Sequence, residues 1–465
     1  MWTIETDNVP FEADIRELLM AFYPDGDDVK VKANKDADTY NFSVDFAKDN
    51  EYTAFVSKIY EGRFLTKCEL KRKLYYAFAN HEGHGLDWGT LTGIRPTKLL
   101  MKGLDEGRPI EDIKKQFKEE FFISDEKLDL AMETALHEKK LLDKIDYKNG
   151  WSLYIGIPFC PSRCAYCSFT SYPIALWQDK KAEYIKALKK EISAVSRIMK
   201  NRKLQTVYMG GGTPTSLEAD ELKDILNCVK ENNDLSELLE LTVEAGRPDS
   251  ITKEKLKALK ECGVTRISVN PQTLNQATLE RIGRKHTVEE FLEKFKLARE
   301  LGFDNINTDI ILGLPGEGIK EVEYTMEKLK ELKPDDITVH TLAVKRAAEL
   351  EKITTDYATI SRMLNIASTA CRELGLKPYY LYRQKNMAGN FENVGYSHEG
   401  KEGIYNILIM EQKQLIVGCG AGSSTKIADS GKGIDRIENV KEPQIYIDRI
   451  DDMIARKAEL KNGTY

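Results

Sequence analysis

From Trp151 onward, short apolar segments alternate with longer amphipathic segments. The apolar segments are expected to be strands at residues 153–158, 206–210, 240–245, 266–269, 306–312 and 336–344. The segments between them have the apolar spacing of helices at residues 180–199, 219–231, 253–262, 288–301, 319–332 and 357–374. Strand–helix units in series favour parallel strands with crossover helices, so this region is predicted to be an α/β fold with one parallel sheet.

The regions before and after these strand–helix units differ from them in their pattern of polar and apolar residues, which predicts three domains. Residues 1–150 begin polar and charged, with expected strands at 29–33 and 40–46 followed by helices, and should form an N-terminal α+β accessory domain. Residues 151–375 hold the strand–helix units, and residues 376–465 form a C-terminal extension. With 41% hydrophobic residues in 465, the chain can bury a large core.

Composition narrows the class of protein. Lys and Arg total 69 against 75 Asp and Glu, with both signs interspersed, which argues against a nucleic-acid partner. The sequence contains no apolar run long enough for a membrane span and no basic N-terminal signal, so a cytoplasmic protein is expected. Three of the eight cysteines lie close together, which favours a metal site in a reducing compartment over a disulfide framework.

Polar and small residues gather where the predicted strands end. In parallel α/β folds the carboxyl ends of the strands meet at one edge, where active sites form. The residues found there are Cys160, Gly210 to Thr213, Glu244, Gln272, Asp309 and His340. We therefore expect a site at this edge of the sheet.

The strand at 153–158 leads into Cys160-x3-Cys164-x2-Cys167. Three thiolates on a short loop can each bind one iron of a [4Fe–4S] cluster and leave the fourth iron open. A structural zinc site would prefer four ligands, and an electron-transfer ferredoxin would need a fourth cysteine. The next cysteine, Cys228, is far along the chain on a predicted helix. An open three-cysteine cluster is the interpretation that fits best.

With Tyr166 before the last cysteine, this loop resembles the signature of the radical S-adenosylmethionine (radical SAM) superfamily. The resemblance implies a partial (β/α)6 parallel barrel with a [4Fe–4S] cluster and S-adenosylmethionine as cofactors. MGGGTPTSL, from Met209, resembles the superfamily's motif for the methionine amino group, which implies that Gly211, Gly212 and Thr213 contact the cofactor. Without the cysteines, these glycines would indicate only a tight turn before a helix.

Four further segments, YIGIPFC, YMGGGTPT, RISVNPQT and DIILGLPGE, resemble the oxygen-independent coproporphyrinogen III dehydrogenase family. WGTLTGIRPTKLL and YRQKNMAGNFENVGYS resemble its HemZ-like branch. That family converts propionates to vinyl groups, which implies a tetrapyrrole substrate and a low-potential electron donor of flavodoxin or ferredoxin type. Besides Tyr166 and the glycine motif, this resemblance implies that Tyr154 lies near the cluster. It also implies five further cofactor contacts, which are Glu244, Gln272, Arg284, Asp309 and Ala343.

Two departures leave the substrate open: Gly156 stands where a histidine is usual, and Ser168-Phe169 replaces a Gly-Cys pair. Relatives with the same core act as heme chaperones, heme ring-opening enzymes or methyltransferases. A carrier would need an axial ligand, for which His340 and His398 are the candidates. Four basic residues are expected either to line the mouth of the substrate cavity or to be solvated at the surface: Lys345, Arg346, Arg383 and Lys385. The glycine-rich segment at 418–424 is either the family's C-terminal motif or a turn.

Overall fold

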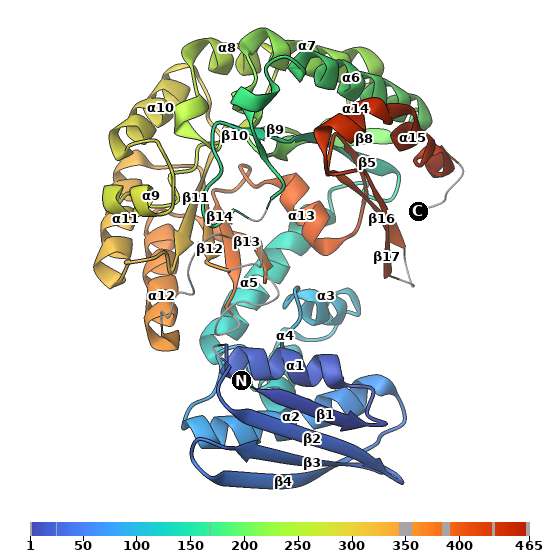
Figure 1. Ribbon diagram of the computed structural model, residues 1–465, viewed down its shortest axis with the longest axis vertical. Coiled ribbons are helices and arrows are strands. Elements are labelled where there is room, and N and C mark those ends of the chain that lie inside the picture. Colours follow the sequence, from blue (N-terminus) through green and yellow to red (C-terminus); the bar gives the residue numbers. More distant parts are fainter. Residues whose placement is uncertain are drawn as a thin grey trace.

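The computed structural model describes residues 2–24, 26–167, 169–343, 356–383, 391–429 and 433–461 (Figure 1). Ser168, Lys345, Arg346 and Lys385, discussed above, lie outside the described residues, as does the last position of the strand predicted at 336–344.

A parallel sheet forms the centre of the molecule, as predicted. Its strands are β5 (Gly150–Ile157), β8 (Lys203–Gly211), β9 (Glu240–Glu244), β10 (Arg266–Ser268), β11 (Ile306–Leu312) and β12 (Asp336–Thr341). They lie in the order β12-β11-β10-β9-β8-β5, and each is parallel to its neighbour. The crossover helices are α6 (Lys181–Ile198), α7 (Ala219–Asn232), α8 (Lys253–Glu261), α10 (Val288–Glu300), α11 (Ile319–Leu332) and α12 (Tyr357–Glu373). They form an arc along one side of the sheet (Figure 1).

The two faces of this sheet differ in polarity. Alternate residues in register, such as Met209, Val243 and Ile267, form an apolar face that belongs to the main core. The residues between them, such as Tyr208 and Glu244, form a polar face. Because parallel sheets normally bury apolar residues on both faces, this polar inner face has to be explained by what it binds or by its internal hydrogen bonds.

The C-terminal strands extend the same sheet at both edges. β14 (Asn393–Ser397) pairs antiparallel with β12, and β13 (Lys377–Tyr382) pairs with β14. At the other edge β15 (Leu415–Cys419) pairs parallel with β5 and is followed by β16 (Ser424–Asp429) and β17 (Gly433–Glu438). The helices of this region are α13 (Ile404–Glu411), α14 (Pro443–Asp448) and α15 (Ile450–Ala455). Within the described residues the sheet stays open, since β13 and β17 each have a single neighbour.

The N-terminal region contributes a separate sheet and three further helices. The sheet contains β1 (Thr3–Asp7), β2 (Val29–Asp36), β3 (Thr39–Phe46) and β4 (Glu51–Lys58), and it packs with α1 (Glu12–Phe22) and α2 (Arg63–Glu82) around a core of its own. The following helices, α3 (Lys98–Asp105), α4 (Ile110–Phe121) and α5 (Asp125–Leu142), pack into the main core instead. The change of core falls between Leu86 and Trp88.

Arg383 joins the N-terminal region to the end of β13. Its guanidinium donates to the carbonyl oxygens of Leu91 at 2.7 Å and Gly93 at 2.8 Å, and it lies 5.1 Å from the centre of the Trp88 ring. The Trp88 indole in turn donates to Glu392 at 2.7 Å. Arg383 is therefore neither a solvated charge nor a group at the cavity mouth, because its side chain is buried and donates to backbone carbonyls of the N-terminal region.

Of the helices that the structure describes, none combines the length and the apolar character needed to cross a bilayer.

Candidate functional site

The cysteine loop leaves the carboxyl end of β5. Cys160 ends the short strand β6 (Phe159–Cys160), which pairs with β7 (Tyr172–Pro173) and so closes the loop at its base. Cys160 and Cys164 are buried and Cys167 is half-buried. Burial raises the pKa of the Cys160 and Cys167 thiols, and the thiol of Cys164 nearby raises both further. Cys164 therefore lies near both other thiols, although among the described residues no three side chains are already grouped to bind a single metal ion. A cluster bound by these cysteines would displace the thiol protons.

Neighbouring elements hold this loop in place. Thr213 Oγ1 lies 3.4 Å from the Cys160 sulfur, and the Ala165 amide donates to the Ile282 carbonyl at 3.0 Å. The Arg284 guanidinium donates to the Tyr166 hydroxyl at 2.9 Å. The loop conformation is therefore set from the β8 turn and from the end of α9 (Gln276–Arg281), far away in sequence.

Arg284 is buried beneath the loop. Besides Tyr166, it donates to the carbonyl of Gly246 at 2.8 Å and approaches His286 Nδ1 at 3.5 Å. Burial, and then the Arg284 charge, lower the pKa of His286 to about 3, so this histidine is neutral. Arg284, which the family resemblance implies as a cofactor contact, is thus buried beside the cysteine loop, whereas its neighbour Lys285 is exposed.

The glycine turn at the end of β8 lies against the cysteine strand. Gly211 has a φ of +111°, a conformation that glycine adopts readily. The Gly212 amide donates to the Ile157 carbonyl and the Thr213 amide to the Phe159 carbonyl, both at 2.7 Å. Both amides are thus used by the protein backbone. Contact of this turn with the cofactor stays a prediction, and for Gly212 and Thr213 it would involve atoms other than these amides.

Gly212→Ala tests this close approach. A methyl group at Gly212 would lie 2.5 Å from the Phe159 carbonyl oxygen, so the turn would have to move away from the cysteine strand. We expect a loss of about 1–3 kcal/mol in the free energy of unfolding together with reduced iron uptake on reconstitution. Thermal unfolding and iron analysis measure both. Gly93→Ala is the matched control because nothing lies within 4 Å of its added methyl group; equal losses in the two variants would contradict the prediction.

Glu244 ends β9 on the polar face. Its carboxylate accepts from the Tyr208 hydroxyl at 2.6 Å. Burial raises its pKa to about 7, opposed by the Tyr208 hydrogen bond and reinforced by the charge of Asp309. The Tyr208 ring lies 4.5 Å from that of Tyr405 and 6.2 Å from that of Tyr154, and the last two rings are 6.3 Å apart, so the three form a cluster of nearly parallel rings. Glu244 therefore titrates near neutral pH beside an aromatic wall.

Asp309 lies on the same face, on β11. Its carboxylate accepts from the amides of Asn270 and Asn307, both at 2.8 Å, and lies 3.8 Å from His340 Nε2. Burial alone would raise the pKa of Asp309, but the contacts with His340 and Asn307 outweigh it and hold that pKa below its usual value. The other candidate histidine, His398, bonds through its amide to the Asp335 carbonyl at the opposite end of β12.

Two further predicted site residues, Gln272 and Ala343, follow the carboxyl ends of β10 and β12. Gln272 is buried with a left-handed φ of +68°, and its backbone bonds to Asp309 and Ile311. Such strained backbone positions concentrate at functional sites. Ala343 is half-buried two residues after β12.

The fold and the site match known proteins. The model of the radical SAM superfamily matches residues 154–329. Over 398 residues the chain is 43% identical to the oxygen-independent coproporphyrinogen-III oxidase-like protein HemZ of Bacillus subtilis, an alignment that covers 82% of this chain and 79% of that protein. The chain belongs to the HemN/HemZ-like family of radical SAM proteins.

Two other relatives of this HemN/HemZ-like chain cover less of it. The heme chaperone HemW of Bacillus subtilis is 40% identical over 200 residues, which are 42% of this chain and 51% of HemW. The solved coproporphyrinogen III oxidase HemN of Escherichia coli has a TM-score of 0.55 at 22% identity, covering 66% of this chain and 70% of HemN. At that identity the HemN structure supports the fold alone.

Sequence reasoning missed several residues of this HemN/HemZ-like site. Tyr208, Asn270 and Arg247 contact Glu244, Asp309 and Cys164, respectively. Asn270 and Arg247 lie just past the carboxyl ends of predicted strands, which is the signal that could have found them, whereas Tyr208 lies inside the strand predicted at 206–210.

Proposed function

We propose that this protein is a radical SAM enzyme that converts propionate groups of coproporphyrinogen III to vinyl groups. The observation that carries the proposal is that the cysteine loop and the glycine turn follow the carboxyl ends of β5 and β8, while the Glu244 and Asp309 carboxylates lie on the polar face of the same sheet. The similarity to a coproporphyrinogen-III oxidase-like protein over most of both chains supports this substrate class.

In this proposal Cys160, Cys164 and Cys167 hold a [4Fe–4S] cluster. The donor set fits: three sulfur ligands lie on one loop, and the fourth iron would be left for S-adenosylmethionine. Together the bound cluster and S-adenosylmethionine would supply a 5′-deoxyadenosyl radical that abstracts hydrogen. The chain's own part is to hold these groups in fixed positions and to keep water out.

In this proposal, residues from different strands contact different parts of S-adenosylmethionine. Gly211, Gly212, Thr213 and Tyr166 would surround the methionine end, next to the cysteines. Glu244 and Asp309 suit the ribose hydroxyls because a buried carboxylate accepts such hydrogen bonds strongly. Tyr154 would form the wall between β5 and the cofactor. The remaining residues assigned to cofactor binding are Gln272, Arg284 and Ala343.

Each propionate would lose one hydrogen atom to the 5′-deoxyadenosyl group, carbon dioxide, and one electron to an acceptor, which leaves the vinyl group. A flavodoxin or ferredoxin would supply the electron that starts each turnover. The identity of the electron donor and a cytoplasmic location of the protein remain predictions.

The test is anaerobic reconstitution with iron and sulfide, followed by dithionite, S-adenosylmethionine and coproporphyrinogen III. We expect 5′-deoxyadenosine together with vinyl product, both measured by mass. Deoxyadenosine without vinyl product would overturn the substrate assignment and keep the radical chemistry.

Glu244 predicts a pH dependence of S-adenosylmethionine binding. Its pKa of about 7 makes the carboxyl group neutral below that pH and an ionised acceptor above it. We expect the dissociation constant, measured by anaerobic equilibrium dialysis on cluster-loaded protein, to fall about tenfold from pH 6 to pH 8. Glu244→Gln should remove this dependence, whereas Glu218→Gln, at an exposed carboxylate, should keep it. A flat profile in the unmodified protein would contradict the assignment.

A second candidate is a tetrapyrrole carrier, favoured by the HemW similarity and by His340 on the polar face. His340 could ligate heme iron through a ring nitrogen. Heme titration of the protein and of His340→Ala tests this: tight binding that requires His340, with no deoxyadenosine, would favour the carrier.

A further inference from the structure

Arg247 lies directly behind the cysteine loop. It follows β9 by three residues, and its side chain is 4% exposed. One terminal nitrogen, Nη1, donates to the sulfur of Cys164 at 3.3 Å and to the Ser162 carbonyl at 3.1 Å. The other, Nη2, donates to the Ser162 hydroxyl at 3.1 Å. A buried cation thus donates a hydrogen bond to one of the proposed cluster ligands.

Asp249 fixes the orientation of this guanidinium. Its carboxylate accepts from Nε at 2.9 Å and from Nη2 at 2.6 Å, a two-point contact that holds the plane of the guanidinium. The Ser250 hydroxyl also donates to the Arg247 carbonyl at 2.7 Å and lies 2.7 Å from Thr215 Oγ1 in the segment after the glycine turn. Arg247 therefore cannot turn away from Cys164 without breaking several contacts.

We propose that Arg247 sets the reduction potential of the cluster through its hydrogen bond to Cys164, and that Asp249 limits the effect. This inference rests on the proposed function, since it requires a cluster on the three cysteines. Hydrogen bonds to cluster sulfurs and nearby charge control the potentials of iron–sulfur clusters. Reduction adds one negative charge to the cluster, so a donating cation stabilises the reduced form and raises the potential. The Asp249 carboxylate opposes part of that charge.

The two members of the pair consequently predict shifts of opposite sign. In Arg247→Gln the cation is lost, and we expect the equilibrium constant for one-electron reduction to fall at least tenfold, a shift of about 59 mV to lower potential. In Asp249→Asn the hydrogen bond to sulfur remains and the opposing charge is lost, so the potential should rise. Arg247→Lys keeps the charge without the two-point contact and should lie between Arg247→Gln and the unmodified protein.

The measurement is a redox titration of reconstituted protein without S-adenosylmethionine, with titanium(III) citrate as reductant and electron paramagnetic resonance as readout. Arg299→Gln is the matched control, because Arg299 also pairs with an aspartate, Asp335, at 2.6 Å, but beside the start of β12. It should leave the potential unchanged.

Shifts of opposite sign in Arg247→Gln and Asp249→Asn support the proposal. Shifts of the same sign, or no shift, overturn it, since a purely structural pair would disturb the loop equally from either side. If Arg247→Gln takes up no cluster, Asp249→Asn alone decides: a higher potential than that of the unmodified protein supports the proposal, and an unchanged or lower potential overturns it. Failure of the unmodified protein to take up a cluster would instead overturn the proposed function, and this inference with it.

Discussion

Cys164→Ala should reduce 5′-deoxyadenosine formation to the background of an assay without protein. Removal of one of three sulfur ligands leaves two irons without protein ligands, so iron and sulfide content after reconstitution should fall as well. The fold should survive, because Arg247 keeps its contacts with Ser162 and Asp249 when the sulfur is lost. Circular dichroism, metal analysis and mass detection of deoxyadenosine measure the three expectations.

Cys68→Ala is the matched control for this prediction. Cys68 is a half-buried free thiol on α2 in the N-terminal region, where it packs against the edge of the main core. It should keep full iron content and full deoxyadenosine release. A Cys164→Ala protein that retains deoxyadenosine release would exclude the loop as the cluster site.

The parallel sheet could be predicted from the sequence because its signal is local. Each strand is a short apolar segment and each helix has regular apolar spacing, so the predicted α11 and β11 ranges agree with the structure to the residue and most others to within a few residues. The cysteine loop is equally local, since its motif lies within eight consecutive residues.

The edges of the sheet could not be predicted, because their pairing is not local. β14 inserts between β12 and β13, and β15 crosses to β5 at the other edge. Arg383 illustrates the same limit. The sequence left it either at the cavity mouth or as solvated charge, whereas its partners Leu91 and Gly93 lie 292 and 290 residues earlier in the chain.

Part of the glycine-rich segment at 418–424 forms the turn between β15 and β16. In this turn the Ala421 amide donates to the Tyr184 hydroxyl at 3.0 Å. That hydroxyl donates to the Gly156 carbonyl at 2.8 Å, and Gly420 packs against the same carbonyl. The segment thus supports the strand that leads into the cysteines.

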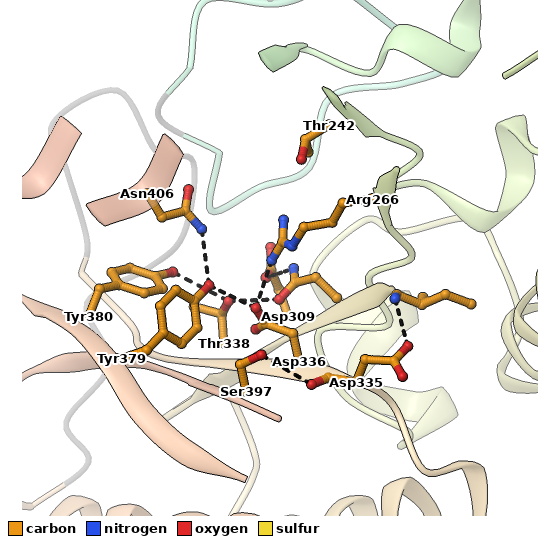
Figure 2. Close-up of polar contacts among 12 residues, drawn as sticks. Thr242, Arg266, Asp309, Asp335, Asp336, Thr338, Tyr379, Tyr380, Ser397 and Asn406 are labelled. Atoms are coloured by element: carbon orange, nitrogen blue, oxygen red, sulfur yellow. Dashed lines mark hydrogen bonds and ion pairs between the residues drawn. The ribbon is translucent and has the colours of Figure 1, made fainter. Parts of the chain in front are cut away.

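The polar face also contains a buried ion pair at its amino end. Arg266 donates to Asp336 at 2.9 Å, the Tyr379 hydroxyl donates to the same carboxylate oxygen at 2.7 Å, and Asn406 lies within 3.4 Å of that hydroxyl (Figure 2). Neither charged side chain is more than 2% exposed. Burial raises the pKa of Asp336 to about 6 even though Arg266 opposes the shift. The pair therefore fills the end of the sheet opposite the cysteines at a cost in desolvation.

Arg266→Met should lower the free energy of unfolding by about 3–5 kcal/mol at pH 8, because it leaves the Asp336 carboxylate buried with the neutral hydroxyl of Tyr379 as its remaining partner. Without the arginine the pKa of Asp336 must rise further in the folded state. A raised carboxyl pKa means that the folded protein binds more protons than the unfolded one, so stability falls as the pH increases between the unfolded and folded pKa values. The loss should therefore be smaller at pH 5.5, as denaturant unfolding at the two pH values would measure.

The double variant Arg266→Met with Asp336→Leu separates the cost of the unpaired charge from that of the cavity. Both partners are then apolar, and a buried pair replaced in this way is often neutral or stabilising. We expect it to recover most of the stability lost in Arg266→Met and to lose the added pH dependence. If Arg266→Met instead unfolds within about 0.5 kcal/mol of the unmodified protein at both pH values, Asp336 is neutral in the fold and the polar face is held by its hydrogen bonds alone.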